Sequence, residues 1–90
     1  MHTIYTLQHV HTGERVFRTY RTRAGARIAQ ANRNRLLGFK NRVERVVDET
    51  HNSEEERYLL ASGEIVSGTY IVVELLVDDE EFERLFSSEA

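Results

Sequence analysis

The segment from Thr22 to Phe39, TRAGARIAQANRNRLLGF, constrains the fold most, because it is the only long stretch whose apolar residues recur at helical spacing. Thr22 offers a hydroxyl group that can accept a hydrogen bond from an unpaired amide of the first turn. Gly38 suits the left-handed residue that closes a helix. We therefore predict one helix over residues 22–39, about 27 Å long at roughly 1.5 Å per residue.

This helix is expected to pack on a sheet through its apolar side. At about 100° per residue, one broad sector holds Ala24, Ile28, Ala29, Leu36 and Phe39. The opposite sector is basic and rich in amides, and it consists of Arg23, Arg27, Gln30 and Asn34, widened by Arg33 and Arg35. The sequence therefore predicts that the apolar sector faces the sheet and that the basic sector faces solvent.

Residues before the helix alternate in the manner of strands. Residues 1–21 predict a β-hairpin that turns at His11-Thr12-Gly13-Glu14. If Gly13 closes a three-residue loop, Leu7 faces Phe17 and Ile4 faces Tyr20 across the hairpin. The hairpin gives the helix a sheet to cover.

Residues 42–77 contain the other expected strands. Residues 42–48, RVERVVD, predict a partly exposed strand, and residues 49–56, ETHNSEEE, predict a mobile acidic loop. A short strand over residues 58–61 and a brief extended piece at residues 65–66 follow. The branched residues of TYIVVELLV, 69–77, indicate the most buried strand, which we expect at the centre of the sheet.

A short acidic helix is expected at residues 78–88, where four acids precede Phe82, Leu85 and Phe86 at helical spacing. The order β-β-α-β-β-β-α predicts an α+β fold, with an antiparallel sheet of four to five strands and one long helix on one face. Ninety residues fit a single domain, 1–90, and the chain has no cysteine to cross-link it.

Charge is distributed unevenly along the chain. Through Arg45 there are ten basic and two acidic residues, which gives +8, and from Val46 onward two basic and thirteen acidic residues give −11. Such a dipolar surface can steer encounters with a charged partner, or let copies pair as a homodimer. No segment approaches the roughly 18 apolar residues of a membrane span, so we expect a cytoplasmic protein with no membrane partner.

Catalytic and cofactor sites are not indicated by any motif. His9 and His11 lie two residues apart, but no third ligand stands at a spacing typical of zinc sites. We expect no metal, no cofactor and no enzyme activity. A small nuclease or other hydrolase using His51 with Glu54 or Glu55 is retained as a second alternative, since these residue types could serve it.

Macromolecular binding is the function that the residues favour. The candidate partner-binding residues are Arg23, Arg27, Gln30, Arg33 and Asn34, because arginine and amide side chains are the types that contact phosphates and base edges. A nucleic-acid-binding domain is the first alternative, although a sequence pI near 5.8 is low for that class. A protein partner is preferred.

Residues 19–30, TYRTRAGARIAQ, together with the T-G-E turn and the later TYIVVE, resemble the small uncharacterised accessory proteins of bacteriophages, particularly those of actinobacterial hosts. The resemblance implies a compact, non-enzymatic protein that binds a host or phage macromolecule, sometimes to inhibit it. It carries no role for any single residue.

Overall fold

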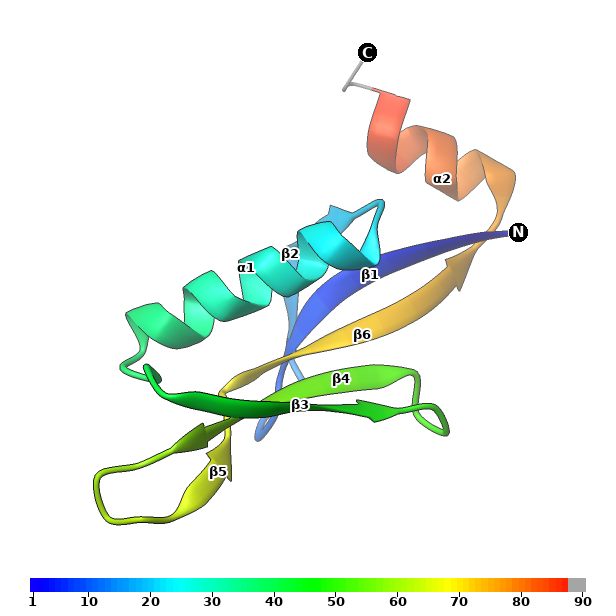
Figure 1. The fold of residues 1–90 in the computed structure, drawn as a ribbon. Helices are drawn as coiled ribbons and strands as arrows, with labels where there is room; N and C mark the ends of the chain where they lie inside the picture. Colours follow the sequence, from blue (N-terminus) through cyan, green and yellow to red (C-terminus); the bar gives the residue numbers. More distant parts are fainter. Residues whose placement is uncertain (88–90) are drawn as a thin grey trace.

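A computed structural model describes residues 1–87 of the chain. Its elements follow one another as β1 (His2–His9), β2 (Arg15–Tyr20), α1 (Arg23–Leu36), β3 (Arg42–Asp48), β4 (Ser53–Leu59), β5 (Ile65–Ser67), β6 (Tyr70–Val77) and α2 (Asp79–Phe86). The predicted α+β class and the order β-β-α-β-β-β-α are confirmed. Figure 1 shows α1 lying along one face of the sheet, with α2 beyond the end of β6.

The sheet has six antiparallel strands in the order β2-β1-β6-β4-β3, with β5 paired to β4. Strand β6 lies between β1 and β4, so its predicted central position is confirmed. It pairs with β1 along its whole length but with β4 only at Ser53 and Glu54. Beyond these residues β4 continues beside β5, and the sheet splays at this end (Figure 1).

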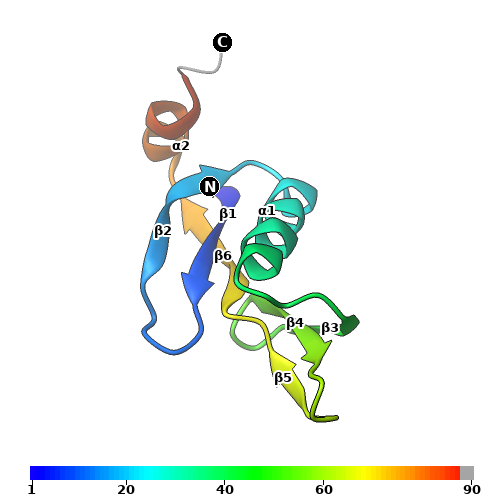
Figure 2. The same cartoon turned by 90° about the vertical axis from the view of Figure 1, so that its left-hand side faces the viewer.

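Helix α1 begins and ends near the residues that the sequence predicts. The Thr22 hydroxyl accepts a hydrogen bond from the amide of Gly25 at 3.1 Å. The helix ends at Leu36, and Gly38 has a φ of +100°, which an L side chain rarely adopts. At 14 residues α1 is shorter than the predicted range 22–39. It crosses β1, β2 and β6, as Figure 2 shows from its C-terminal end.

The hydrophobic core lies between α1 and these three strands. Its fully buried members are Leu7, Ala26 and Val72, and Tyr5, Val16, Tyr20, Ala29 and Tyr70 pack around them. Alanines on the helix let its backbone approach the sheet closely, while the larger side chains come from the strands. The core is small, so polar contacts carry much of the remaining interface.

The predicted register of the hairpin is wrong by one residue. Tyr20 pairs with Tyr5 rather than with Ile4. The loop has four residues between His9 and Glu14, closed by hydrogen bonds from the His9 amide to the Glu14 carbonyl at 2.8 Å and from the Gly13 amide to the His9 carbonyl at 2.9 Å. The ladder is also irregular after Thr6.

This register places Phe17 in solvent. Because neighbouring strand residues point to opposite faces, Val16 packs on the core and Phe17 is fully exposed. The predicted contact between Leu7 and Phe17 therefore does not form.

The prediction of a mobile loop over residues 49–56 is also wrong. Only residues 49–52 form the turn, and β4 already begins at Ser53. Asn52 adopts a φ of +50°, a conformation that asparagine tolerates. Glu54 and Glu56 alternate with exposed or half-exposed residues and are buried.

Helix α2 docks on the start of the chain. The Asp78 carboxylate accepts a hydrogen bond from the Glu81 amide at 2.8 Å, which caps the helix. Phe86 is buried, and the ring of Phe82 stacks on His2 with centroids 4.2 Å apart. The last predicted helical residue, 88, lies outside the described residues. No helix among residues 1–87 is long and apolar enough to cross a membrane.

Candidate functional site

Helix α1 is rotated from the predicted orientation, so that Gln30 and Asn34 of its polar sector face the sheet beside Ala26 and Ala29. Gln30 and Asn34 are completely buried, whereas Ile28 and Leu36 are 64% and 85% exposed. The prediction that Gln30 and Asn34 face solvent is therefore wrong. The physical reason is that β4 supplies buried carboxylates beneath this side of the helix, and these carboxylates need donors.

Glu54 is the first of these carboxylates, with 6% of its side chain exposed. Its Oε1 accepts a hydrogen bond from Arg27 Nε at 2.7 Å and lies 3.4 Å from Arg45 Nη1. Its Oε2 lies 3.3 Å from Arg23 Nε. Arg23 and Arg27, predicted to face outward, are thus partly exposed and engaged in ion pairs at the margin of the interface.

Glu56 is the second carboxylate and is fully buried. It accepts hydrogen bonds from Tyr58 Oη at 2.6 Å, Arg42 Nη1 at 2.9 Å, Arg45 Nη2 at 3.2 Å and Asn34 Nδ2 at 3.2 Å. Burial acts to raise the pKa of Glu56, but the hydrogen bonds of Tyr58, Arg42 and Asn34 together hold this pKa below its usual value. Glu56 is therefore charged inside the interface.

The two amides join the helix to the backbone of β4 and β6. Gln30 Nε2 donates to the carbonyl oxygens of Glu54 and Tyr70 at 3.0 and 3.1 Å. The Tyr70 amide donates to Asn34 Oδ1 at 2.9 Å, and Asn34 Nδ2 donates back to the Tyr70 carbonyl at 3.2 Å. Gly68 leaves room for this pair, because a Cβ there would lie 2.5 Å from Asn34 Nδ2. Throughout residues 1–87, every buried side-chain polar atom has a hydrogen-bond partner.

Stability at alkaline pH is expected to depend on Tyr58. Burial and the hydrogen bond to Glu56 raise the pKa of Tyr58 to about 12. In the unfolded chain a tyrosine loses its proton near pH 10, so this stabilisation is complete below pH 10 and is lost as pH rises toward 12. We expect Tyr58→Phe to flatten the fall in unfolding free energy over this window, measured by urea titration at several pH values. An unchanged slope would contradict the assigned pKa.

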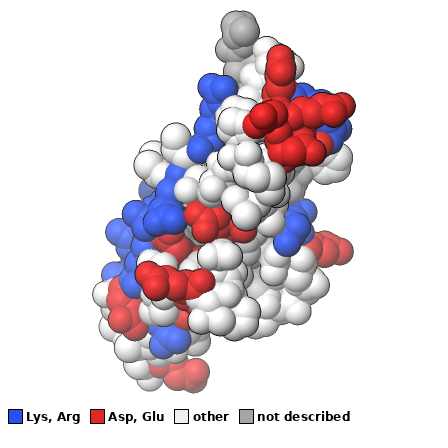
Figure 3. Space-filling view, turned by 90° about the vertical axis from the view of Figure 1, so that its right-hand side faces the viewer, with Lys and Arg blue, Asp and Glu red and all other residues white. Residues whose placement is uncertain are grey.

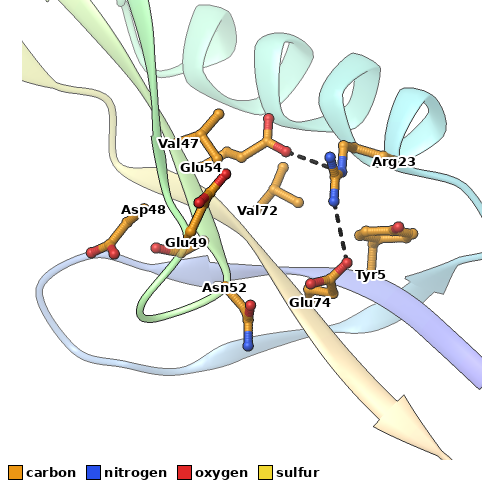
Figure 4. A pocket seen from close by; sticks show the side chains of 10 residues that line it. Tyr5, Arg23, Val47, Asp48, Glu49, Asn52, Glu54, Val72 and Glu74 are labelled. Carbon is orange, nitrogen blue, oxygen red and sulfur yellow. Dashed lines mark hydrogen bonds and ion pairs between the residues drawn. The ribbon is translucent and has the colours of Figure 1, made fainter.

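Arg23, the first residue of α1, borders a small hollow of about 110 Å³, shown in Figure 4. Its guanidinium reaches Glu54 and, at 3.2 Å, Glu74, and it lies over the ring of Tyr5 at 5.7 Å. These contacts raise the pKa of Arg23, the nearby Tyr5 contributing most. Two of the four carboxylates that line the hollow, Glu54 and Glu74, are thus neutralised by Arg23.

The residues named for a hydrolase have other partners. His51 Nδ1 lies 2.8 Å from Asp48 Oδ2, and this hydrogen bond lowers the pKa of Asp48. Glu54 is held under α1, and Glu55 pairs with Arg57 at 3.0 Å. The structure does not bring His51 together with Glu54 or Glu55 through any contact.

His9 organises the hairpin loop. Its Nδ1 accepts hydrogen bonds from the amides of His11 at 3.2 Å and Thr12 at 3.3 Å. The His9 ring also meets Tyr70 edge to face, with centroids 5.5 Å apart. Within the described part of the chain, no group of three or more His, Cys, Asp or Glu side chains could hold a metal ion.

Eleven of the twelve basic side chains fall into two groups. Arg23, Arg27, Arg42, Arg45, Arg57 and Arg84 form ion pairs with carboxylates. Arg15, Arg18, Arg33, Arg35 and Lys40 form no ion pair within residues 1–87. Of the five candidate residues, Arg33 alone is both strongly exposed and without a carboxylate.

Arg33 lies at a second hollow of about 240 Å³, which we call the hairpin–helix hollow. It is lined by His9, Glu14, Arg15, Val16, Phe17, Arg33 and Tyr70. The Arg33 guanidinium lies 5.2 Å from the centre of the Tyr70 ring. Two arginines that form no ion pair within residues 1–87, the exposed Phe17, Tyr70 and the acidic Glu14 therefore border one hollow.

Acidic side chains gather elsewhere. Figure 3 shows them clustered on α2, beside the grey terminus, whereas basic and acidic side chains intermingle on the left of that view. Helix α2 and its cap contribute Asp78, Asp79, Glu80, Glu81 and Glu83. Helix α2 and its cap therefore carry a local excess of acidic side chains, whereas the rest of this face carries both signs of charge.

Glu54, Glu56 and Tyr58 are the important residues that sequence reasoning missed. A signal was present, because they recur at a spacing of two, the period of a strand. The acidity of Glu54 and Glu56 favours a loop, and the facing arginines and amides make the burial of these two carboxylates tolerable.

Comparisons with protein-family models, with curated proteins and with solved structures found no match to this chain.

Proposed function

We propose that this is a non-enzymatic accessory protein of bacteriophage type that binds a host or phage protein in the cytoplasm, through the hairpin–helix hollow. The observation that supports this function is the separation of ion-paired from unpaired arginines. Arg23 and Arg27 neutralise interior carboxylates, whereas Arg15 and Arg33 keep their charge for another molecule.

The residue types of the hollow suit a protein partner. Arginine and aromatic residues are enriched at protein interfaces, where a buried aromatic ring and a paired guanidinium supply most of the binding energy. Phe17 is fully exposed, so its contact with a partner removes a large apolar surface from water. A partner with acidic and apolar side chains complements this surface.

Nucleic acid is the second candidate. Arg15 and Arg33 beside the rings of Phe17 and Tyr70 could contact phosphates and stack bases. The sequence-based argument for nucleic-acid binding is weakened, because Gln30 and Asn34 are buried and cannot reach base edges. The net charge of −3 also opposes binding to a polyanion.

Reversing the charge of Arg33 is expected to abolish partner capture. The wild-type chain, Arg33→Glu and the control Arg35→Glu would be immobilised and exposed to a lysate of the cells in which the chain is naturally made. Arg35 lies in the same last turn of α1, about 200° around the helix from Arg33, and its side chain bonds Asn32, so the control has the same net charge on a different side of the helix. We expect a protein retained by the wild type and by Arg35→Glu, and at least about tenfold less on Arg33→Glu.

Two results would contradict the proposed function. Equal retention by Arg33→Glu would remove the hairpin–helix hollow from recognition. Retention that disappears after nuclease treatment of the lysate, and that falls steeply with salt, would assign the surface to nucleic acid.

A further inference from the structure

We propose that the hairpin–helix hollow binds a single carboxylate group of the partner protein through the guanidinium of Arg33 and the imidazole of His9. This inference rests on the proposed protein-binding function and specifies the chemistry that the partner presents. Arg33 supplies the positive charge, and His9 supplies an uncharged donor beside it. The carboxylate belongs to an aspartate or glutamate side chain or to the end of the partner chain, and in each case it offers the same two oxygen atoms.

Arg33, Tyr70 and His9 form one cluster on the sheet face that α1 covers. His9 pairs with Tyr70 across β1 and β6, so the two side chains point to the same face, and Tyr70 packs on the core beneath α1. The His9 ring meets the Tyr70 ring edge to face, with centroids 5.5 Å apart, and the Arg33 guanidinium lies 5.2 Å from the centre of the Tyr70 ring. Tyr70 therefore brings the two donors to one hollow, which all three residues line.

The hairpin loop decides which nitrogen of His9 carries the proton. Nδ1 accepts hydrogen bonds from the amides of His11 and Thr12 at 3.2 and 3.3 Å. An imidazole nitrogen that accepts a hydrogen bond has no proton of its own, so the neutral ring carries its proton on Nε2. Within residues 1–87, Nε2 donates to no other group. An N–H donor at the border of the hollow is thus left for a ligand.

Arg33 is the charged donor of the cluster. It is exposed and forms no ion pair within the described chain. A guanidinium on the face of an aromatic ring keeps the N–H groups along its edge, and a carboxylate accepts two of them in parallel. Glu14 also lines the hollow, so its charge opposes a ligand with more than one negative charge. One carboxylate therefore fits better than a run of phosphates.

Arg15 borders the same hollow but is held by a different group. It pairs with Gln8, whose side chain points to the opposite sheet face from Leu7 and His9, and its Nε donates to Gln8 Oε1 at 3.3 Å. Arg15 therefore adds only a more distant charge to the hollow. We expect Arg15→Gln to weaken carboxylate binding by no more than about threefold, because solvent and salt screen a distant charge.

Two small peptides test the need for a carboxylate and distinguish its source. AVEVA with both ends blocked carries only a side-chain carboxylate, and AVAVA with a blocked amino end carries only a terminal one. Each peptide is titrated into the isotope-labelled full chain while the backbone amide signals are followed by NMR. We expect at least one of them to bind with a Kd of about 1 mM, and blocked AVQVA, which has the shape of AVEVA without its charge, to bind at least about tenfold more weakly.

Variants at the two donors should weaken the binding of the acidic peptide. Arg33→Glu removes the charge, whereas His9→Asn keeps an oxygen that accepts from the loop amides and removes the more distant N–H group. We expect each change to weaken binding at least about fivefold. The matched controls Arg35→Glu and His11→Asn should stay within about twofold of the wild type.

The imidazole of His9 gives a readout that an indirect effect on folding would not change. NMR that correlates ring protons with ring nitrogens should show Nδ1 without a proton in the free chain. The signal of the Nε2 proton should move to lower field as the acidic peptide binds, because the new hydrogen bond is charge-assisted. A proton on Nδ1, no binding of either acidic peptide, equal binding of AVQVA, or unchanged binding by His9→Asn would each overturn the carboxylate site.

Failure of this inference and failure of the proposed function can be distinguished. If the carboxylate site fails but capture of a protein from the lysate still depends on Arg33, the partner uses the hollow through other groups, and only the inference is wrong. Tighter binding of oligothymidylate than of the acidic peptides would assign the hollow to nucleic acid and would contradict both.

Discussion

Replacing Glu56 with glutamine is expected to lower the free energy of unfolding by about 3 kcal/mol, a large part of the roughly 5–15 kcal/mol typical of a small domain. The side chain is fully buried and accepts hydrogen bonds from four groups. Glutamine keeps the shape but removes the charge, so Arg42 and Arg45 lose their shared counter-ion. Its amide nitrogen would also face donors that it cannot accept from.

Glu55→Gln is the matched control for this change. Glu55 lies on the same strand, one residue away, and faces the other side of the sheet, where its 24% exposed side chain pairs with Arg57. An exposed pair of this kind contributes little, so we expect a loss of at most about 0.5 kcal/mol. Urea unfolding of the two variants and the wild type measures both effects. Equal losses would contradict the assignment of Glu56 as the anchor of the interface.

The effect of Glu56→Gln should depend on pH with a definite sign. Because the pKa of Glu56 is lower in the folded chain than in the unfolded chain, its charge stabilises the fold fully above about pH 4.5. That stabilisation disappears as pH falls through the folded-state pKa. The difference between wild type and variant should therefore narrow in acid, whereas a difference that grows would contradict the direction of the shift.

Most of the architecture could be predicted from local chemistry. The cap at Thr22, the left-handed Gly38 and the run of branched residues that becomes β6 each depend on the residue itself or its near neighbours. Such features act through hydrogen bonds and sterics within a few residues. They fixed the element order and the central strand without knowledge of the tertiary structure.

The orientation of α1 could not be predicted in the same way. Hydrophobic periodicity assumes that the side facing the sheet is the apolar one, which would bury Ile28 and Leu36. The sheet beneath α1 instead presents Glu54 and Glu56, and a helix can satisfy them only with donors such as Arg27 and Asn34. Which sector is buried depends on a strand about twenty residues later in the chain.

The exposed position of Phe17 escaped prediction for a related reason. The length of the hairpin loop decides the register, and one additional loop residue moves every later side chain to the other face. Local sequence allows both a three-residue and a four-residue loop around Gly13. The candidate binding surface thus depends on the register of the β1–β2 hairpin and on the rotation of α1. Neither can be predicted from a short segment of sequence.

The orientation of α1 decides which arginines are available to a partner, and thiol labelling tests it most directly. The chain has no cysteine, so Ile28→Cys and Ala26→Cys each introduce a single thiol on one helix. Ile28 is 64% exposed and Ala26 is completely buried. We expect the thiol at position 28 to react with a maleimide as fast as a peptide thiol, and the thiol at position 26 to react at least about a hundredfold more slowly, since it must await an opening of the fold. Faster labelling at position 26 than at position 28 would show that the apolar sector faces the sheet, and would contradict the buried polar network and the binding surface derived from it.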